Sequence, residues 1–252
     1  DTILEMADYK ADTGRGGRCR QLIVTGCLSQ RHPDEMAAEL PEVDHFLGSS
    51  DMLQLKPVLT SHAARMLVGN PADWLVQNSD PRRISTRGAS AYVKIAEGCN
   101  RSCSFCVIPQ LRGKQRSRTP RDIQDEVQRL VSAGVLEINL VSQDTISYGR
   151  DESGSSTERF NLATLVEQLS HVEQLRWLRL FYLYPEKLSD DIVDLIANQP
   201  KIVPYIDMPL QHASDEMLKR MRRGHGGARL RQLVERVREK IPGVVFRTAF
   251  IV

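Results

Sequence analysis

Short apolar runs alternate with longer helical repeats along most of the chain. From residue 91 onward, the helical repeats place apolar residues three and four positions apart, as in Leu162, Leu165, Val166 and Leu169. We expect such faces to form the core rather than to contact a cofactor. Five apolar runs between the helices are predicted to be strands: Ala91 to Ile95, Ile138 to Val141, Trp177 to Leu183, Ile202 to Ile206 and Val244 to Val252.

This alternation predicts right-handed βα units around a parallel sheet. Five such units favour a partial TIM-like (β/α) barrel over an open sheet. One helix has a clear start, because Thr119 precedes Pro120 and Asp122 in a capping pattern. We expect this helix to end at Gly134.

A separate, smaller α/β unit is predicted for residues 1–68. It has a strand at Leu22 to Val24, a helix from Asp34 to Leu40 and a short strand from Val43 to Leu47. Residues 69–84 are rich in Gly, Asn, Asp and Pro and predict a linker, after which 85–252 form the barrel. The chain opens within a helical pattern and stops within an apolar run, so we expect a fragment that lacks both termini.

Polar and reactive residues follow the predicted strands. Cys99 comes after the first strand, Gln143 and Asp144 after the second, Tyr184 after the third and Gln211 after the fourth. The carboxyl ends of the strands form the face on which barrel enzymes build their active sites. This placement favours an enzyme.

Composition adds limits rather than a function. Of 252 residues, 41% are hydrophobic, and the net charge is +2, so only local charge clusters can indicate a polyanionic partner. Neither an apolar run of about 20 residues nor a signal peptide is present. We expect a cytoplasmic protein with no membrane partner.

The cysteines are the strongest chemical signal. Three of the five, Cys99, Cys103 and Cys106, fall within eight residues. Soft thiolates suit an iron-sulfur cluster or zinc, but a structural zinc site usually closes with four ligands and no fourth Cys or His lies nearby. Three cysteines on a 4Fe-4S cluster leave one iron open for catalysis. A zinc loop or redox-labile thiols is the alternative.

The spacing of these cysteines, with Phe105 before the last, resembles the radical S-adenosylmethionine (SAM) superfamily. The resemblance implies that the open iron chelates the amino and carboxylate groups of SAM. An electron from the cluster then breaks the sulfur–carbon bond and releases a deoxyadenosyl radical, so no side chain is expected to act as a catalytic acid or base.

The wider motifs are similar to the methylthiotransferases of that superfamily. They are Lys94-Ile-Ala-Glu-Gly-Cys99-Asn, Ile108-Pro109, Arg112-Gly113 and Arg116-Ser-Arg118. Val24-Thr-Gly-Cys27-Leu-Ser-Gln30 resembles the last cysteine motif of the family's amino-terminal domain, which implies that Cys27 binds a second 4Fe-4S cluster. The other two cysteines of that motif set are expected upstream of Asp1. Cys19 lies outside the motifs and is interpreted as an ordinary thiol.

Three further motifs resemble the branch that transfers a methylthio group to the β-carbon of an aspartate in a small-subunit ribosomal protein. They are Val141-Ser-Gln-Asp-Thr145, Tyr182-Leu-Tyr-Pro185 and Asp207 to Ser214. The resemblance implies two molecules of SAM per reaction, the ribosomal protein or subunit as partner, and a reductant such as flavodoxin or ferredoxin. The alternatives are the tRNA adenosine branch and an inactive iron-sulfur scaffold. A small RNA-binding β domain is expected past Val252.

The remaining candidates are weaker. Phe105, Gln143, Asp144, Gln211 and Arg247 are candidate cofactor-binding residues, although polar side chains at strand ends also cap helices or satisfy the backbone. His212 favours a structural hydrogen bond. A first group of five cations is a candidate to face RNA or the SAM carboxylate: Arg112, Lys114, Arg116, Arg118 and Arg121. A second run is interpreted as a solvated helix end: Lys219, Arg220, Arg222 and Arg223.

Overall fold

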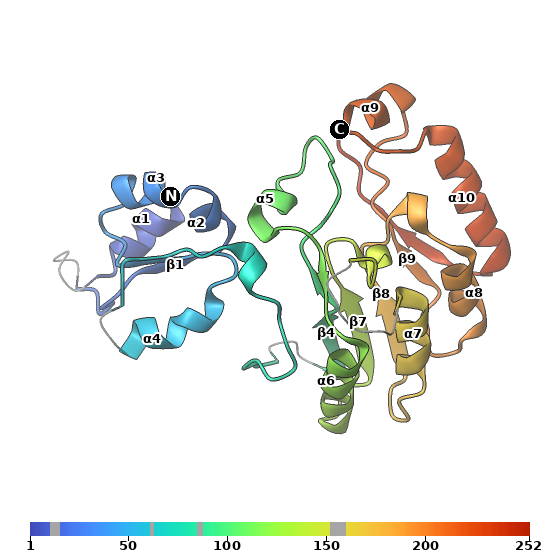
Figure 1. Ribbon diagram of the computed structural model, residues 1–252, viewed down its shortest axis with the longest axis horizontal. Coiled ribbons are helices and arrows are strands. Elements are labelled where there is room, and N and C mark those ends of the chain that lie inside the picture. Colours follow the sequence, from blue (N-terminus) through green and yellow to red (C-terminus); the bar gives the residue numbers. More distant parts are fainter. Residues whose placement is uncertain (11–15, 61–62, 85–87, 152–159) are drawn as a thin grey trace. The chain divides into compact units, whose positions relative to one another are not determined.

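The computed structural model describes residues 1–10, 16–60, 63–84, 88–151 and 160–252 (Figure 1). The chain divides into two compact units. Unit 1 comprises Asp1–Leu75 with Gln110–Gly113, and unit 2 comprises Val76–Pro109 with Lys114–Val252. The segment predicted as a linker is therefore shared, with 69–75 in unit 1 and 76–84 in unit 2. Residues 85–87, where the predicted barrel domain begins, lie outside the described residues.

Unit 1 is a small parallel α/β unit. Its sheet has the order β1 (Ile23–Thr25), β2 (His45–Leu47) and β3 (Met66–Leu67). Met36, Val43 and Phe46 form the centre of its core. Its helices are α1 (Thr2–Ala7), α2 (Cys27–Arg31), α3 (Pro33–Glu39) and α4 (Leu55–Thr60), with short 3-10 turns at Met52–Gln54 and Pro71–Asp73.

Unit 2 contains the parallel strands of the predicted barrel. They are β4 (Ser90–Lys94), β7 (Glu137–Val141), β8 (Trp177–Leu180), β9 (Tyr205–Asp207) and β10 (Val245–Arg247). Ala91, Ile138 and Leu178 align across the first three strands, and Ile206 pairs with Phe246. A parallel bridge from Leu178 to Ile202 joins the two groups. The predicted parallel α/β architecture is confirmed.

The helices of unit 2 cover the strands with the predicted apolar faces. They are α6 (Pro120–Ser132), α7 (Leu162–Ser170), α8 (Asp190–Asn198) and α10 (Gly227–Lys240), and α9 (Asp215–Arg220) follows β9. Helix α5 (Ile108–Arg112) is divided between the units, because Gln110–Gly113 belong to unit 1. Helix α8 packs between α7 and α10 (Figure 1). The start of α6 is as predicted, because Thr119 Oγ1 accepts the Asp122 N–H at 3.3 Å. None of the helices in the described residues is long and apolar enough to cross a membrane.

Three predicted strands are too long. The third ends at Leu180 because Tyr182 adopts a left-handed φ of 56°. The fourth is reduced to Tyr205–Asp207, since Pro204 has no N–H to donate to a ladder. The fifth ends at Arg247, and beyond it Phe250 makes only an isolated bridge to Gln211.

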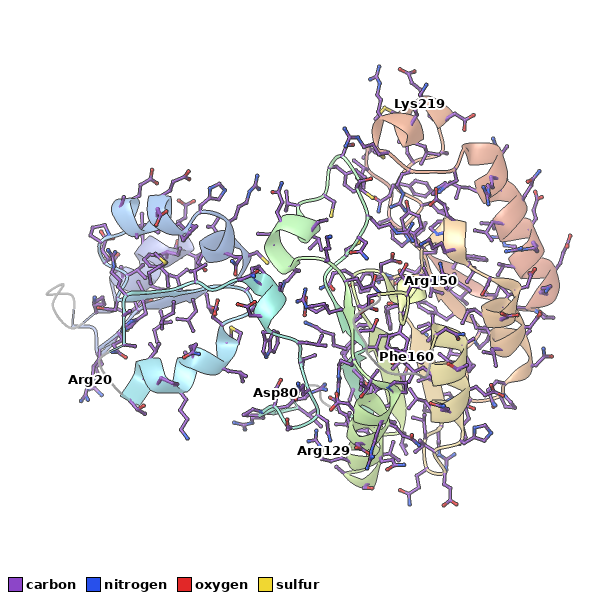
Figure 2. All side chains as sticks on the ribbon, viewed as in Figure 1. Arg20, Asp80, Arg129, Arg150, Phe160 and Lys219 are labelled. Atoms are coloured by element: carbon purple, nitrogen blue, oxygen red, sulfur yellow. The ribbon has the colours of Figure 1, made fainter. Side chains whose placement is uncertain are left out.

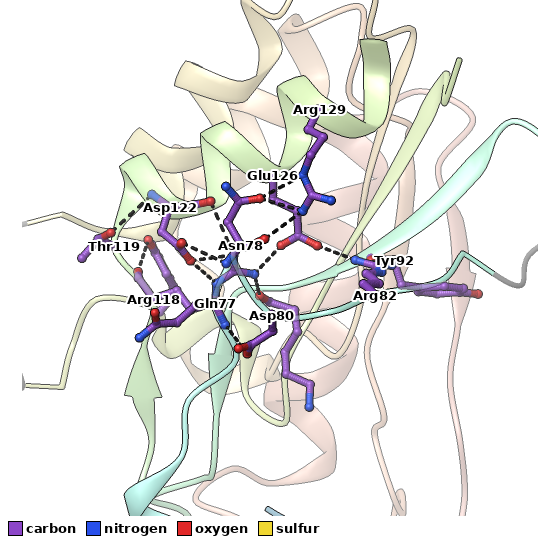
Figure 3. A network of polar contacts seen from close by, with 12 residues as sticks. Gln77, Asn78, Asp80, Arg82, Tyr92, Arg118, Thr119, Asp122, Glu126 and Arg129 are labelled. Carbon is purple, nitrogen blue, oxygen red and sulfur yellow. Dashed lines mark hydrogen bonds and ion pairs between the residues drawn. The ribbon is translucent and has the colours of Figure 1, made fainter. Parts of the chain in front are cut away.

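A buried charge network fixes the segment before β4 against α6 (Figure 3). The Arg118 side chain, 1% exposed, pairs with Glu126 and Asp122 at 2.6 Å and donates to the Lys94 carbonyl at 2.6 Å. Arg82 also pairs with Glu126, and Asn78 donates its N–H to Asp122 at 3.0 Å. Arg118 therefore does not belong to a solvent-facing cation patch, because burial beside two carboxylates fixes it inside unit 2.

We predict that Arg118→Met lowers the free energy of unfolding by about 3 kcal/mol, because it leaves buried Glu126 and a buried carbonyl without their donor. Urea denaturation of the variant measures this. Arg121→Met is the matched control, because Arg121 is exposed and its loss should change stability by no more than about 0.5 kcal/mol. Equal stability of the two variants would contradict the structural role of Arg118.

Candidate functional site

The cysteine loop leaves the carboxyl end of β4 and is closed at its base. Strands β5 (Ala96–Glu97) and β6 (Arg116–Ser117) pair antiparallel, so the intervening residues form one loop. Across this loop, the Gln115 N–H donates to Asn100 Oδ1 at 3.0 Å. The loop thus stands on the face of the sheet predicted to carry the site.

The three loop cysteines differ in their surroundings. Cys99 is buried, and Cys103 and Cys106 are half-buried. Burial raises the pKa of the Cys99 thiol; the Arg101 N–H, 3.4 Å from Cys99 Sγ, opposes this, whereas Asp144 and Cys106 add to it. Arg223 Nη1 lies 3.5 Å from Cys103 Sγ. Two of the three sulfurs therefore already accept an N–H.

Within the described part of the chain, no three His, Cys, Asp or Glu side chains could hold a single metal ion. In a 4Fe-4S cluster each thiolate binds a different iron, so the sulfurs need not converge. Hydrogen bonds to the sulfurs are a feature of such sites. The donor set fits a cluster better than an ion.

Arg101 connects the cysteine loop to the ends of two strands. Its Nε donates to Asp144 Oδ2 at 2.7 Å, and its Nη1 lies 3.4 Å from Glu186 Oε2. Its Cζ is 3.5 Å from the centroid of the Tyr184 ring. Burial opposes the charge of Arg101, but Asp144, Tyr184 and Glu186 together outweigh burial and raise its pKa.

Two of the predicted cofactor-binding residues lie together beside this loop. Gln143 Nε2 donates to buried Glu97 at 3.0 Å, and Asp144 Oδ2 accepts from Ser147 at 2.7 Å. Within the described residues, Gln143 Oε1, Asp144 Oδ1 and Arg101 Nη2 are buried and have no hydrogen-bond partner. An unsatisfied buried polar atom costs about 1–3 kcal/mol, so these atoms are suited to a polar ligand.

The contacts of the other predicted residues lie outside the group formed by Arg101, Gln143 and Asp144. The Phe105 side chain is 44% exposed. Gln211 has a left-handed φ of 70°, and its N–H donates to Ala249 at 2.9 Å. Arg247 lies at the end of β10 and pairs with Asp207 at 2.9 Å. His212 has the expected structural role, since its Nδ1 accepts the N–H of Ser214 at 2.9 Å.

The two cysteines of unit 1 also differ. Cys19 Sγ donates to the Gln21 carbonyl at 3.1 Å. Cys27 is exposed at the first residue of α2, immediately after β1. Of the two, Cys27 is the thiol accessible to an external ligand.

Sequence reasoning missed three residues of the site. Glu97 is fully buried beneath Gln143, Glu186 pairs with Arg101, and Arg223 contacts Cys103. The sequence pattern places Arg223 with its neighbours in a run of cations predicted to be solvated. Its local pattern gives no sign of its burial, because the contact depends on a cysteine 120 positions away.

The parallel strands, with a loop of three cysteines at their carboxyl ends, define an α/β domain of the barrel type. The model of the radical SAM superfamily matches residues 93–252, more than half of the chain. The chain therefore belongs to the radical SAM superfamily.

This chain is similar over its whole length to several curated relatives. It is 63% identical over 254 residues to the ribosomal protein uS12 methylthiotransferase RimO of Sorangium cellulosum (strain So ce56). It is 46% identical over 252 residues to the RimO of Anaeromyxobacter sp. (strain K). Each alignment covers 100% of this chain but only 51% and 52% of the relatives, so the chain spans about half their length.

Solved structures support the fold. The radical S-adenosylmethionine methyltransferase TsrM from Kitasatospora setae matches with a TM-score of 0.67 at 15% identity, covering 98% of this chain and 54% of that one. The radical enzyme OxsB matches with a TM-score of 0.63 at 13% identity, covering 99% of this chain and 38% of that one. At these identities the similarity concerns the fold alone.

Next to the site, His225 is buried against Glu186. Its Nδ1 lies 3.4 Å from Glu186 Oε1, and it borders a cavity of about 290 Å³ that Pro185, Arg229 and Arg236 also line. Burial lowers the pKa of His225, and Arg223 lowers it further, whereas Glu186 raises it. The folded state therefore favours the neutral ring.

We predict that His225 contributes to a loss of stability in mild acid. The unfolded chain takes up the proton near the ordinary pKa of about 6.5, whereas the folded state does so only at lower pH, so stability falls as the pH drops below about 6.5. His225→Gln should flatten this part of the stability profile, measured by urea denaturation at a series of pH values. Exposed His171→Gln is the control, and an unchanged slope in His225→Gln would refute the prediction.

Proposed function

We propose that this chain carries the radical chemistry of a methylthiotransferase that modifies an aspartate of a small-subunit ribosomal protein. The observation that carries the proposal is the 63% identity, over all of this chain, to a relative named ribosomal protein uS12 methylthiotransferase. The cysteine loop at the carboxyl ends of the strands supports it chemically. The protein would act in the cytoplasm, with a small redox protein such as flavodoxin or ferredoxin as electron donor.

Cys99, Cys103 and Cys106 would hold the 4Fe-4S cluster. The N–H groups aimed at Cys99 and Cys103 support this assignment, because they would stabilise thiolates. Cys27, exposed after β1, would supply one thiolate to the second cluster. With SAM bound, the first cluster would supply the one-electron cleavage that yields the deoxyadenosyl radical.

The buried, unsatisfied polar atoms beside the loop complement the two charged ends of the amino-acid part of SAM. Asp144 Oδ1 and Gln143 Oε1 are acceptors suited to an ammonium group, and Arg101 Nη2 is a donor suited to a carboxylate. Phe105, Gln211 and Arg247 would complete the site around the rest of SAM. The role of these side chains is to bind and orient, while the burial of Cys99 and Asp144 excludes water.

We predict that Cys103→Ala abolishes deoxyadenosine formation under reducing conditions, because two thiolates are too few to hold the cluster. The complete protein, reconstituted with iron and sulfide, is assayed for iron content and for deoxyadenosine. Cys19→Ala is the matched control and should retain both, since the Cys19 thiol donates to a local backbone carbonyl and lies outside the cysteine loop. Undiminished deoxyadenosine from Cys103→Ala would overturn the cluster assignment.

The substrate is tested in the source organism. Disrupting the gene and weighing the small-subunit ribosomal proteins and the tRNA nucleosides by mass spectrometry separates the possibilities. Loss of one methylthio group from a ribosomal protein supports the proposal. Loss from a tRNA adenosine would assign the tRNA branch instead, and no loss would indicate an inactive scaffold.

A further inference from the structure

The cysteine loop is bound to the turn that follows α9. The Ser104 N–H donates to the Met221 carbonyl at 3.2 Å, and Ser104 Oγ donates to the Arg220 carbonyl at 2.8 Å. Ser104 immediately follows Cys103. The turn therefore fixes the middle of the loop at a ligand position.

The turn has the geometry of a Schellman motif. Arg222 N–H donates to Lys219 at 3.0 Å, and Arg223 N–H donates to Leu218 at 2.8 Å. Arg222 occupies the left-handed position, with φ 55°, where glycine is usual. A long side chain adopts this conformation only where the surroundings impose it. Here the result is to direct the next residue, Arg223, toward the loop.

Arg223 is held on three sides. Its Nη2 donates to the Pro209 carbonyl at 3.0 Å, its Cζ lies 4.0 Å from the centroid of the Tyr184 ring, and its Nη1 lies 3.5 Å from Cys103 Sγ. The guanidinium of Arg101 also stacks over the Tyr184 ring. Because the guanidinium is planar and rigid, these contacts fix the direction of its N–H groups.

The charge of Arg223 is not balanced by a carboxylate. The residue is only 7% exposed, yet no ion pair found in the described ranges includes it. The nearby carboxylates of Asp144 and Glu186 pair with Arg101 instead. A buried cation requires a compensating anion. Among the described groups in contact with Arg223, burial raises the pKa of Tyr184 to about 12, so the sulfur of Cys103 is the group suited to become the anion.

We propose that Arg223 is a positioning residue that donates to the Cys103 thiolate in the cluster-bound protein and raises the reduction potential of the cluster. The inference rests on the proposed function, because it requires a cluster on Cys103. Reduction adds one electron and hence one negative charge to the cluster. A fixed cation and an N–H at the ligand sulfur stabilise the reduced state more than the oxidised state.

The test is a redox titration of the reconstituted complete protein, with dithionite as reductant and the EPR signal of the reduced cluster as readout. Arg223→Met should lower the equilibrium constant for reduction at least tenfold, which is 59 mV for a one-electron couple. Arg223→Lys keeps the charge and should stay closer to wild type. Lys219→Met is the matched control, since Lys219 is an exposed cation of the same run (Figure 2) and should leave the potential unchanged.

Each result of the redox titration either supports or overturns the role of Arg223. A potential in Arg223→Met equal to that of Lys219→Met overturns the inference while leaving the proposed function intact. A wild-type protein that binds no cluster refutes the proposed function itself. If Arg223→Met cannot hold a cluster but Arg223→Lys can, the requirement for a cation here is supported. Loss of the cluster in both variants would mean that Arg223 serves folding alone and would overturn the inference.

Discussion

The ion pair between Arg101 and Asp144 is the contact on which the site depends. It joins the middle of the cysteine loop to the carboxyl end of β7, with 2.7 Å between Nε and Oδ2. Other contacts hold the loop at its β-paired base, at the turn after α9 and through Arg223, but the Arg101–Asp144 pair joins it to the residues that follow β7. Because Arg101 lies between Cys99 and Cys103, the ion pair restrains the backbone of this part of the loop relative to the sheet.

Buried arginines perform two different tasks in unit 2. Arg118 is balanced by Asp122 and Glu126, so its network is closed and stabilises the fold. Arg101 is balanced by Asp144 and Glu186 but, among the residues that the structure describes, its Nη2 has no hydrogen-bond partner and no carboxylate forms an ion pair with Arg223. The charge network at α6 is therefore balanced, whereas the arginines beside the cysteines are only partly balanced by carboxylates. A ligand with complementary charges would complete the second set.

The parallel core could be predicted well from the sequence, because it follows from short-range patterns. Buried strands read as apolar runs, and Thr119 caps α6 through a residue three positions away. Strand ends were less predictable, since Tyr182 and Pro204 interrupt pairing through backbone geometry. The roles of Arg118 and Arg223 were missed because a run of cations looks the same in sequence whether it is solvated or folded inward.

Three buried polar atoms beside the cysteine loop indicate a binding site that the arrangement of strands and helices does not by itself reveal. Gln143 Oε1, Asp144 Oδ1 and Arg101 Nη2 are all buried without hydrogen-bond partners in the part of the chain that the structure describes. At about 1–3 kcal/mol each, such groups lower stability unless a bound molecule restores their hydrogen bonds. A core selected only for stability would have replaced them with apolar side chains. Their presence next to three thiols is therefore best explained by binding, and the same reasoning connects the buried charge of Arg223 to an anionic sulfur.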